Sequence, residues 1–276
     1  MSDLYCVMGN PVEHSKSPWI HARFAQLTGQ DMHYDKRLIP IGGFARAVAL
    51  FRAEGGRGCN VTVPFKFEAA PLATRLTARA ELAGACNVLR FDGEEVFADN
   101  SDGVGLVSDI ARNAGVPLAG RDVLLIGAGG ASAGVLGPLI EAGPRLIVVA
   151  NRTQAKAQHL IDRHAALAQQ HRVNLRAPEL LQVNEDFDVV INASASSLAG
   201  QAVPVSPAVL RRGTLACDLM YGPAAQGFMD WASAHGAVAR DGLGMLVEQA
   251  AEAFLVWRGV RPPSGQVLEE LRATWR

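Results

Sequence analysis

Three short segments near the start of the chain are unusually rich in polar side chains that could take part in chemistry. They are His14-Ser15-Lys16-Ser17-Pro18, Asn60-Val61-Thr62-Val63-Pro64-Phe65-Lys66 and Asp99-Asn100-Ser101-Asp102-Gly103. Each lies where a strand is expected to end or a helix to begin. Open α/β folds place their ligands at such points, so these segments predict a ligand site.

Lys66 and Asp102 are the residues in these segments whose chemistry suits proton transfer. Reduction of a carbonyl by hydride needs a proton donor near the oxygen, and oxidation of an alcohol needs an acceptor there. A lysine beside an aspartate can serve both directions, because the carboxylate orients the ammonium group. Composition alone does not decide for this pair, since a surface lysine and a carboxylate at a helix start are also common.

A glycine-rich turn in the middle of the chain predicts a dinucleotide site. Gly127-Ala128-Gly129-Gly130-Ala131-Ser132 follows an apolar run and opens a predicted helix. Glycine permits the tight turn and lets the backbone approach a pyrophosphate, whose charge suits the N–H groups of a helix N-terminus. The match to G-x-G-x-x-G is imperfect because Ser132 holds the last position. Its place between strand and helix is nevertheless what the mechanism needs.

The residues after the next apolar run favour NADP over NAD. NAD sites usually carry an acidic residue about 20 residues past the glycines, on the ribose 2′-OH. Here Asn151-Arg152-Thr153 stands in that region, and Lys156 lies one helical turn further on. A guanidinium can bind a 2′-phosphate that an acidic side chain would repel. Solvated side chains at a helix start are the alternative for Arg152 and Lys156.

Residues 1–103 are predicted to form an α/β domain with a mixed sheet. Residues 4–8 are short and apolar, as expected of a strand, and a helix should follow with Ser17 as its N-cap and Pro18 at its first position. A hairpin is expected near Asp92-Gly93. Strand-like and helix-like segments alternate through this part of the chain, which is typical of the α/β class.

Residues 104–239 are predicted to form a doubly wound parallel sheet of the Rossmann type. Continuous apolar runs, typical of strands buried on both faces, recur between helical stretches. They are Val123-Leu124-Leu125-Ile126, Leu146-Ile147-Val148-Val149, Val189-Val190-Ile191 and Leu215-Ala216-Cys217. Residues 240–276 contain two further helices, the last from about Ser264 to Trp275, and we expect them to return to the first domain.

Composition and charge exclude several classes of function. The 276 residues include 26 basic and 27 acidic side chains, so no basic excess marks a nucleic-acid surface. No apolar stretch is long enough to span a bilayer, and the first residues lack the pattern of a signal peptide. The four scattered cysteines show no metal-ligand spacing and suit a reducing cytosol. We therefore expect a cytoplasmic protein without a metal. We also expect a monomer or a homodimer, two states between which the sequence does not decide.

Six strings, in order along nearly the whole chain, resemble the shikimate dehydrogenase family. They are Gly9-Asn10-Pro11 with Ser15-Lys16-Ser17-Pro18, residues 60–66, Asn100-Ser101-Asp102-Gly103, residues 127–132, Asn151-Arg152-Thr153, and Asp241-Gly242-Leu243-Gly244-Met245-Leu246. The resemblance implies reversible reduction of 3-dehydroshikimate to shikimate with NADPH, a step toward chorismate and the aromatic amino acids.

The resemblance also implies a role for each matching residue. Lys66 and Asp102 would form the catalytic pair, while Ser15 and Ser17 would hydrogen-bond the substrate carboxylate. Residues implied to bind or adjoin the substrate ring are Asn60, Thr62, Asn87, Gln249 and Tyr221. Residues implied to bind NADP are Gly127, Ala128, Gly129, Gly130, Ala131, Asn151, Arg152, Thr153, Lys156 and Gly242.

Some positions depart from the pattern of the family. Residues 192–197 lack the glycine that many relatives carry there, Gly222 replaces a common Asn, and Gln226-Gly227 replaces a common Thr-Pro. These changes leave the detail of the cofactor loops open.

Two alternative functions stay open at this point. One is a quinate or dual quinate/shikimate dehydrogenase that uses NAD, and the other is a non-catalytic dinucleotide-binding sensor of the same fold. The quinate or dual dehydrogenase is disfavoured by serine at both 15 and 17, which favours shikimate, and by Arg152, which favours NADP. The non-catalytic sensor is disfavoured by the presence of Lys66 and Asp102.

Overall fold

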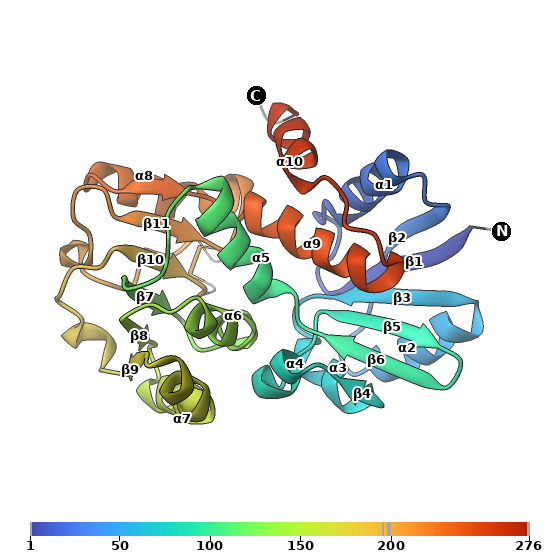
Figure 1. Cartoon of the computed structure of the whole chain (residues 1–276), viewed down its shortest axis with the longest axis horizontal. Helices are drawn as coiled ribbons and strands as arrows, with labels where there is room; N and C mark the ends of the chain where they lie inside the picture. Colours follow the sequence, from blue (N-terminus) through green and yellow to red (C-terminus); the bar gives the residue numbers. More distant parts are fainter. Residues whose placement is uncertain (1, 195, 198–199, 275–276) are drawn as a thin grey trace. The chain divides into compact units, whose positions relative to one another are not determined.

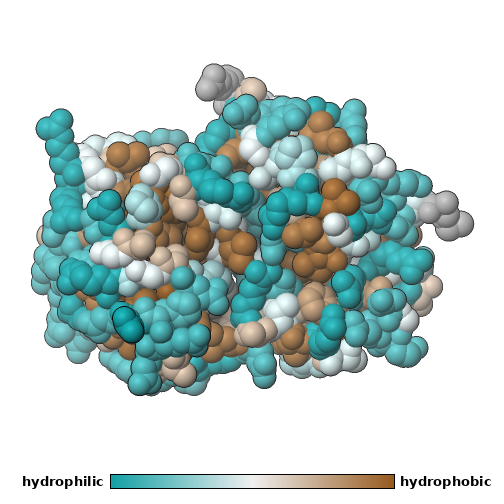
Figure 2. All heavy atoms as spheres, in the orientation of Figure 1, coloured by the Kyte–Doolittle hydropathy of each residue, from teal (hydrophilic) through white to brown (hydrophobic). Residues whose placement is uncertain are grey.

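The structure is a computed structural model that describes residues 2–194, 196–197 and 200–274 (Figure 1). Its contacts divide the chain into two compact units: Met1–Gly105 with Val247–Arg276, and Leu106–Leu246. The division falls inside two helices, α5 (Asp102–Ser108) and α9 (Leu243–Arg258). Polar side chains cover much of the visible surface, between separate apolar areas (Figure 2). Within the described ranges, no helix is long and apolar enough to cross a membrane.

The first unit has the predicted mixed sheet, with strand order β2-β1-β3-β5-β6-β4. Strand β1 pairs in parallel with β2 and β3, and β5 and β6 form the predicted antiparallel hairpin. The strands are β1 (Asp3–Gly9), β2 (Met32–Leu38), β3 (Gly56–Val61), β4 (Arg75–Leu76), β5 (Val88–Asp92) and β6 (Glu95–Asp99). The helices are α1 (Ser17–Thr28), α2 (Phe44–Ala53), α3 (Lys66–Ala69), η1 (Ala70–Leu72), α4 (Ala78–Ala83) and α10 (Ser264–Ala273), with parts of α5 and α9.

Side chains of β1 alternate between two apolar cores, because successive residues of a strand point to opposite faces of the sheet. Cys6 and Met8 pack with α2 on one face, and Tyr5 and Val7 pack with Trp257 of α9 on the other. The C-terminal helices thus return to this unit, as predicted. Helix α10 is tied to α1 by an ion pair between Arg23 and Glu270, with 2.7 Å between Nε and Oε2. The predicted end at Trp275 lies outside the described residues.

The start of α1 differs from the prediction by one residue. Ser17 is the first helical residue rather than the N-cap, a position that Lys16 occupies without a side-chain capping bond. The hydroxyl of Ser15 instead accepts a hydrogen bond from the Ser17 N–H, with 3.3 Å between N and Oγ. A serine two residues earlier therefore satisfies one of the N–H groups that a helix start leaves unpaired.

The second unit has the predicted parallel sheet, with strand order β12-β11-β10-β7-β8-β9. Numbered from β7 as the first strand, the order from the β9 edge is 3-2-1-4-5-6, the Rossmann order. The strands are β7 (Asp122–Ile126), β8 (Leu146–Ala150), β9 (Asn174–Arg176), β10 (Val189–Asn192), β11 (Leu215–Asp218) and β12 (Val238–Arg240). The helices are η2 (Asp109–Asn113), α6 (Gly130–Glu141), α7 (Gln154–His171), η3 (Leu180–Gln182), η4 (Pro207–Val209), η5 (Gly222–Ala225) and α8 (Gln226–Ala234), with parts of α5 and α9.

The core of this sheet explains its continuous apolar strands. All five residues of β8 are buried, and so are all four of β10. Strands β7 and β10 are neighbours, and this is the point at which the strand order reverses. Ligands of doubly wound sheets bind outside the carboxyl ends of the strands at that point, which is where the glycine turn after β7 lies.

Candidate active site

Lys66 and Asp102 are in direct contact. Lys66 Nζ donates to Asp102 Oδ2 at 2.5 Å, and the two side chains are 16% and 6% exposed. Lys66 opens α3 and Asp102 opens α5, shortly after the ends of β3 and β6. The contact joins residues 36 positions apart and leaves the ammonium group partly accessible. It can therefore exchange a proton with a bound molecule while the carboxylate holds it in place.

Asn87 fixes the other carboxylate oxygen of Asp102. Its Nδ2 donates to Asp102 Oδ1 at 2.8 Å and lies 3.0 Å from Ser101 Oγ and 3.3 Å from Gln249 Oε1. Its Oδ1 accepts the backbone N–H of Ser101 at 2.8 Å. The Asp102 carboxylate is thus bonded on both oxygens, and Asn87 and Gln249, 162 residues apart, belong to one buried polar cluster.

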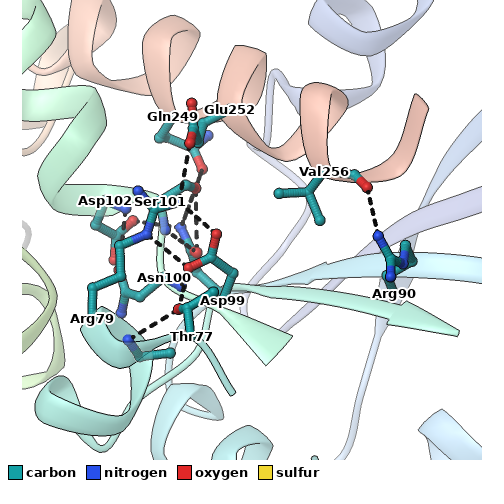
Figure 3. Close-up of polar contacts among 12 residues, drawn as sticks. Thr77, Arg79, Arg90, Asp99, Asn100, Ser101, Asp102, Gln249, Glu252 and Val256 are labelled. Atoms are coloured by element: carbon teal, nitrogen blue, oxygen red, sulfur yellow. Dashed lines mark hydrogen bonds and ion pairs between the residues drawn. The ribbon is translucent and has the colours of Figure 1, made fainter. Parts of the chain in front are cut away.

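A second network, shown in Figure 3, lies beside the turn that carries Asp102. Asp99 accepts two hydrogen bonds from Arg79, at 2.7 Å from Nε and 2.5 Å from Nη2, and one from Thr77 Oγ1 at 2.6 Å. Arg79 Nη2 also donates to Glu252 Oε1 at 3.0 Å. Glu252 lies on α9, the helix that carries Gln249. Arg79 therefore links the end of β6, where Asp99 lies, to α9. Asp99 falls in a polar segment that the sequence singled out, but no sequence signal pointed to Arg79.

We expect Asp99→Asn to lower the free energy of unfolding at pH 7 by roughly 3 kcal/mol, because it removes the buried anion that pairs with Arg79. Burial would raise the pKa of Asp99, but hydrogen bonds and charge from Arg79 outweigh it and hold this pKa below the ordinary value. Ionised Asp99 therefore stabilises the fold above the unfolded pKa of about 3.9, and this stabilisation is lost as the pH falls through the lowered pKa.

Urea denaturation of both proteins at pH 7 and at pH 3 measures this effect. The difference between wild type and Asp99→Asn should be largest at pH 7 and smaller at pH 3. The matched control is Asp92→Asn at the exposed hairpin turn on the same sheet, which should change stability by less than about 0.5 kcal/mol. An equal loss at both pH values would contradict the ionic explanation.

The remaining predicted substrate residues of the first unit lie around the carboxyl ends of β1 and β3. These strands are parallel, with Met8 opposite Val61, so the segments that follow them leave the same edge of the sheet. Ser15 and Ser17 follow β1, while Asn60 and Thr62 lie at the end of β3. Ser17 and Asn60 are buried, and Ser15 and Thr62 are half-buried. The structure therefore brings these residue types to one edge, as the sequence predicted from strand ends.

In the second unit, the glycine turn leaves room for a backbone-bound anion. Gly127 has φ +112°, and a Cβ there would lie 3.0 Å from the backbone carbonyl carbon and oxygen of Ala193. Gly129 is the N-cap of α6, and a Cβ there would meet nothing within 4 Å. The first turn of α6, which begins Gly130-Ala131, contains no acidic residue. A side chain is thus excluded at Gly127 while the helix start stays open, which fits a dinucleotide diphosphate.

Arg152 and Lys156 are exposed at the start of α7, after the end of β8. No hydrogen bond or ion pair within the described part of the chain engages either charged group. Asn151 Nδ2 donates to the carbonyl oxygen of Thr153, the N-cap of α7, at 2.9 Å, which fixes the turn that carries Arg152. The two cations are therefore available to an anionic ligand on this edge of the sheet.

Tyr221 and Gly242 belong to the second unit and lie on neighbouring segments. Tyr221 is the N-cap of η5, directly after β11. The Gly242 N–H donates to the Met220 carbonyl oxygen at 2.8 Å, and a Cβ at Gly242 would lie 2.4 Å from the carbonyl oxygen of Leu219. Only glycine permits this approach, so Gly242 sets the path of the chain past residues 219–221. Across the described residues, no group of acidic, histidine or cysteine side chains could hold a metal ion.

Comparisons with known proteins agree with this geometry. Three family models match the chain: the shikimate dehydrogenase substrate binding domain at residues 7–89, shikimate / quinate 5-dehydrogenase at 109–201, and the shikimate 5′-dehydrogenase C-terminal domain at 242–272. A protein from Acidovorax sp. (strain JS42), named shikimate dehydrogenase (NADP(+)), is 68% identical over 99% of this chain and 96% of its own.

The chain belongs to the shikimate dehydrogenase family.

Solved structures share the fold over the full length. The Ael1 enzyme from Pseudomonas putida is 44% identical, with a TM-score of 0.89 over 98% of each chain. Shikimate 5-dehydrogenase from Thermus thermophilus, in complex with NADP(H) and shikimate, is 29% identical, with a TM-score of 0.82 over 98% of this chain and 99% of its own.

The structure gives a physical reason for one departure from the family pattern. Gly222 has φ +64°, in the left-handed region. Asparagine is the residue besides glycine that adopts this region most readily, so glycine in place of the common Asn keeps the same backbone geometry.

The serine-rich segment that lacks the family glycine is held by a buried aspartate. Asp218, at the end of β11, accepts from Asn192 Nδ2 at 2.9 Å and from the hydroxyl of Ser197. It also accepts the N–H of Met220 at 2.8 Å. Burial raises the pKa of Asp218, against the opposing hydrogen bonds from Ser197, Met220 and Asn192. Asp218 thus joins the loops after β10 and β11. Ala195, in the same segment, lies outside the described residues.

Proposed function

We propose that the protein catalyses the reversible reduction of 3-dehydroshikimate to shikimate with NADPH, on the way to chorismate and the aromatic amino acids. The observation that supports this most strongly is the contact between Lys66 and Asp102, in a chain 68% identical to a protein named shikimate dehydrogenase (NADP(+)).

Lys66 is the proton donor in this proposal. When bound, NADPH supplies the hydride that adds to the carbonyl carbon, and the oxygen then needs a proton. The ammonium group of Lys66, held by Asp102, donates that proton, and in the reverse direction the neutral amine accepts it. The Asp102 carboxylate orients Lys66, while Asn87 donates to its second oxygen.

The polar residues at the sheet edge bind the substrate in the orientation that Lys66 requires. Ser15 and Ser17, beside the start of α1, hydrogen-bond the carboxylate. Asn60, Thr62, Asn87 and Gln249 bind the ring hydroxyls, and the family resemblance implies that Tyr221 adjoins the ring. Side-chain amides both donate and accept, as hydroxyls demand, and buried groups of this kind discriminate strongly against analogues that lack a hydroxyl.

The second unit binds the cofactor. The backbone of residues 127–131 and the start of α6 receive the diphosphate, and Gly242 shapes the neighbouring loop. Arg152 and Lys156, with Asn151 and Thr153 supporting the turn, receive the 2′-phosphate that distinguishes NADP from NAD. In this proposal the first unit, Met1–Gly105 with Val247–Arg276, is the substrate domain, and the second unit, Leu106–Leu246, is the NADP domain. The boundaries predicted after residues 103 and 239 differ from these because the chain passes between the units inside the helices α5 and α9. We place the enzyme in the cytoplasm, as a monomer or a homodimer.

Initial rates of oxidation of shikimate and of quinate, each with NADP and with NAD, test the proposal. The rate, followed as nicotinamide absorbance, is expected to be largely confined to shikimate with NADP. Comparable activity with quinate or NAD would move the protein to the dual-specificity branch of the family. No activity in any of the four pairs would favour a non-catalytic dinucleotide sensor.

A further inference from the structure

Tyr34, on β2, contacts a predicted substrate residue although it lies in the buried interior of the first unit. Its hydroxyl donates to Asn60 Oδ1 at 2.7 Å, and Tyr34 and Asn60 are 7% and 6% exposed. No part of the proposed mechanism requires Tyr34. No pattern in the sequence singles it out, because an aromatic residue in a strand is usually a core residue.

Two neighbours leave the Asn60 side chain only one amide orientation. Asn60 Nδ2 donates to the backbone carbonyl oxygen of Asn87 at 3.1 Å. A carbonyl oxygen can only accept, so the NH₂ end must face Asn87 and the oxygen must face Tyr34. A flipped amide would set two oxygens against each other at Asn87. The Asn60 Nδ2 group carries a second N–H besides the one that it donates to Asn87.

The surroundings of Tyr34 hold its hydroxyl as a donor in a fixed place. The ring stacks on His21, with 4.3 Å between centroids and 13° between planes. Burial raises the pKa of Tyr34 well above its ordinary value, nearby Cys6 and Cys59 add to the rise, and a hydrogen bond with Ser17 opposes it. The hydroxyl therefore keeps its proton. It also lies next to Ser17, a second predicted substrate residue.

Buried His21 contributes rigidity rather than charge. It is fully buried and also lies near Phe24, Phe254 and Trp257, with ring centroids 5.2 to 6.3 Å apart. Burial lowers the pKa of His21 to about 3, against a weaker opposing effect of Asn60. The imidazole is therefore neutral at neutral pH, and the ring on which Tyr34 stacks does not change its charge during turnover.

We propose that Tyr34 is a positioning residue for substrate recognition: its hydroxyl holds the Asn60 amide in the orientation that directs an N–H at a ring hydroxyl of the substrate. This inference rests on the proposed function. Without the Tyr34 hydroxyl, the amide oxygen loses its donor and the Asn60 side chain is held only by its bond to the Asn87 carbonyl oxygen, which fixes the productive orientation less tightly. The cost falls on substrate recognition and not on cofactor binding.

Tyr34→Phe tests the proposal, since it removes one oxygen atom and keeps the ring. We expect kcat/KM for shikimate to fall about five- to tenfold, mainly through KM, the size of one lost hydrogen bond. KM for NADP should stay within about twofold, because that site lies in the second unit. The matched control is Tyr5→Phe, which removes a buried hydroxyl from β1 beside Arg258, in the same apolar core as Tyr34. It should leave both constants unchanged.

A double-mutant cycle separates positioning from a general structural effect. If Tyr34 acts through Asn60, Tyr34→Phe should change kcat/KM by less than about twofold in an Asn60→Ala background, because the two effects are not additive. A full five- to tenfold loss in that background would overturn the proposal while leaving the proposed function intact. So would an equal rise in KM for shikimate and for NADP.

Calorimetric binding of shikimate to the wild-type protein distinguishes the two levels of failure. If the wild-type protein binds and oxidises shikimate but the effects of Tyr34→Phe and Asn60→Ala are additive, only the role of Tyr34 is overturned. A wild-type protein that neither binds nor oxidises shikimate overturns the proposed function and the role of Tyr34 with it.

Discussion

Lys66→Ala is expected to lower kcat for shikimate oxidation by about 10²- to 10⁴-fold, the range that a positioned general acid–base group contributes. The reason is geometric: Lys66 Nζ lies 2.5 Å from Asp102 Oδ2 and is the partly accessible member of the pair. The methyl group of alanine cannot accept the proton of the alcohol. Lys16 is the one other lysine in the three polar segments. The affinity for NADP should be unchanged, because the predicted cofactor residues belong to the second unit.

Steady-state kinetics with shikimate and fluorescence titration with NADPH measure the two quantities separately. Lys36→Ala is the control: Lys36 lies on β2 of the same unit, 3.5 Å from Glu13 Oε2, and its loss should leave kcat within about twofold. Turnover of Lys66→Ala close to that of the wild type would remove Lys66 from the mechanism. A loss of NADPH affinity equal to the loss of turnover would indicate a folding defect instead.

Arg152→Asp is expected to raise KM for NADP by about 10- to 100-fold, as for the loss of a charge-assisted hydrogen bond, and to change KM for NAD by no more than about threefold. Arg152 follows the end of β8, at the edge of the sheet where the glycine turn lies, and its side chain is exposed. A carboxylate there repels a 2′-phosphate and can hydrogen-bond a 2′-hydroxyl, so the change acts on the difference between the cofactors.

Initial rates at saturating shikimate, measured over a range of NADP and of NAD concentrations, give the ratio of KM for NADP to KM for NAD. Arg163→Asp, an exposed charge reversal further along α7, should leave that ratio near the wild-type value. Equal losses for NADP and NAD would show that Arg152 contacts a part common to both, such as the diphosphate.

The strand and helix pattern was predictable because it is local. The short apolar run of residues 4–8 and the unbroken apolar runs of β7, β8, β10 and β11 indicate strands that are buried on both faces. Strand β2 was missed because it lies at the edge of its sheet and contains the charged run Asp35-Lys36-Arg37, which no apolar pattern marks as a strand. Edge strands are half-solvated, so their sequences resemble loops.

The residue types of the candidate site were also visible in the sequence, and the family resemblance placed them in order. Gly127 must be glycine because of its backbone angle and its close approach to Ala193. The glycine-rich motif indicates this requirement in the sequence. The roles of individual site residues remain predictions that the experiments above decide.

The family resemblance paired Lys66 with Asp102, but the physical contacts among the site residues depend on the tertiary structure. Lys66 and Asp102, or Asn87 and Gln249, are brought together by strand order and by the return of α9, and neither is a local property of the chain. The sequence contains no local signal for Arg79 or Tyr34, because a helix-surface arginine and a strand aromatic are common in any α/β protein. Arg79 and Tyr34 meet their partners, Asp99 and Asn60, only when the sheet forms, since burial then restricts each polar group to the few neighbours within hydrogen-bond reach.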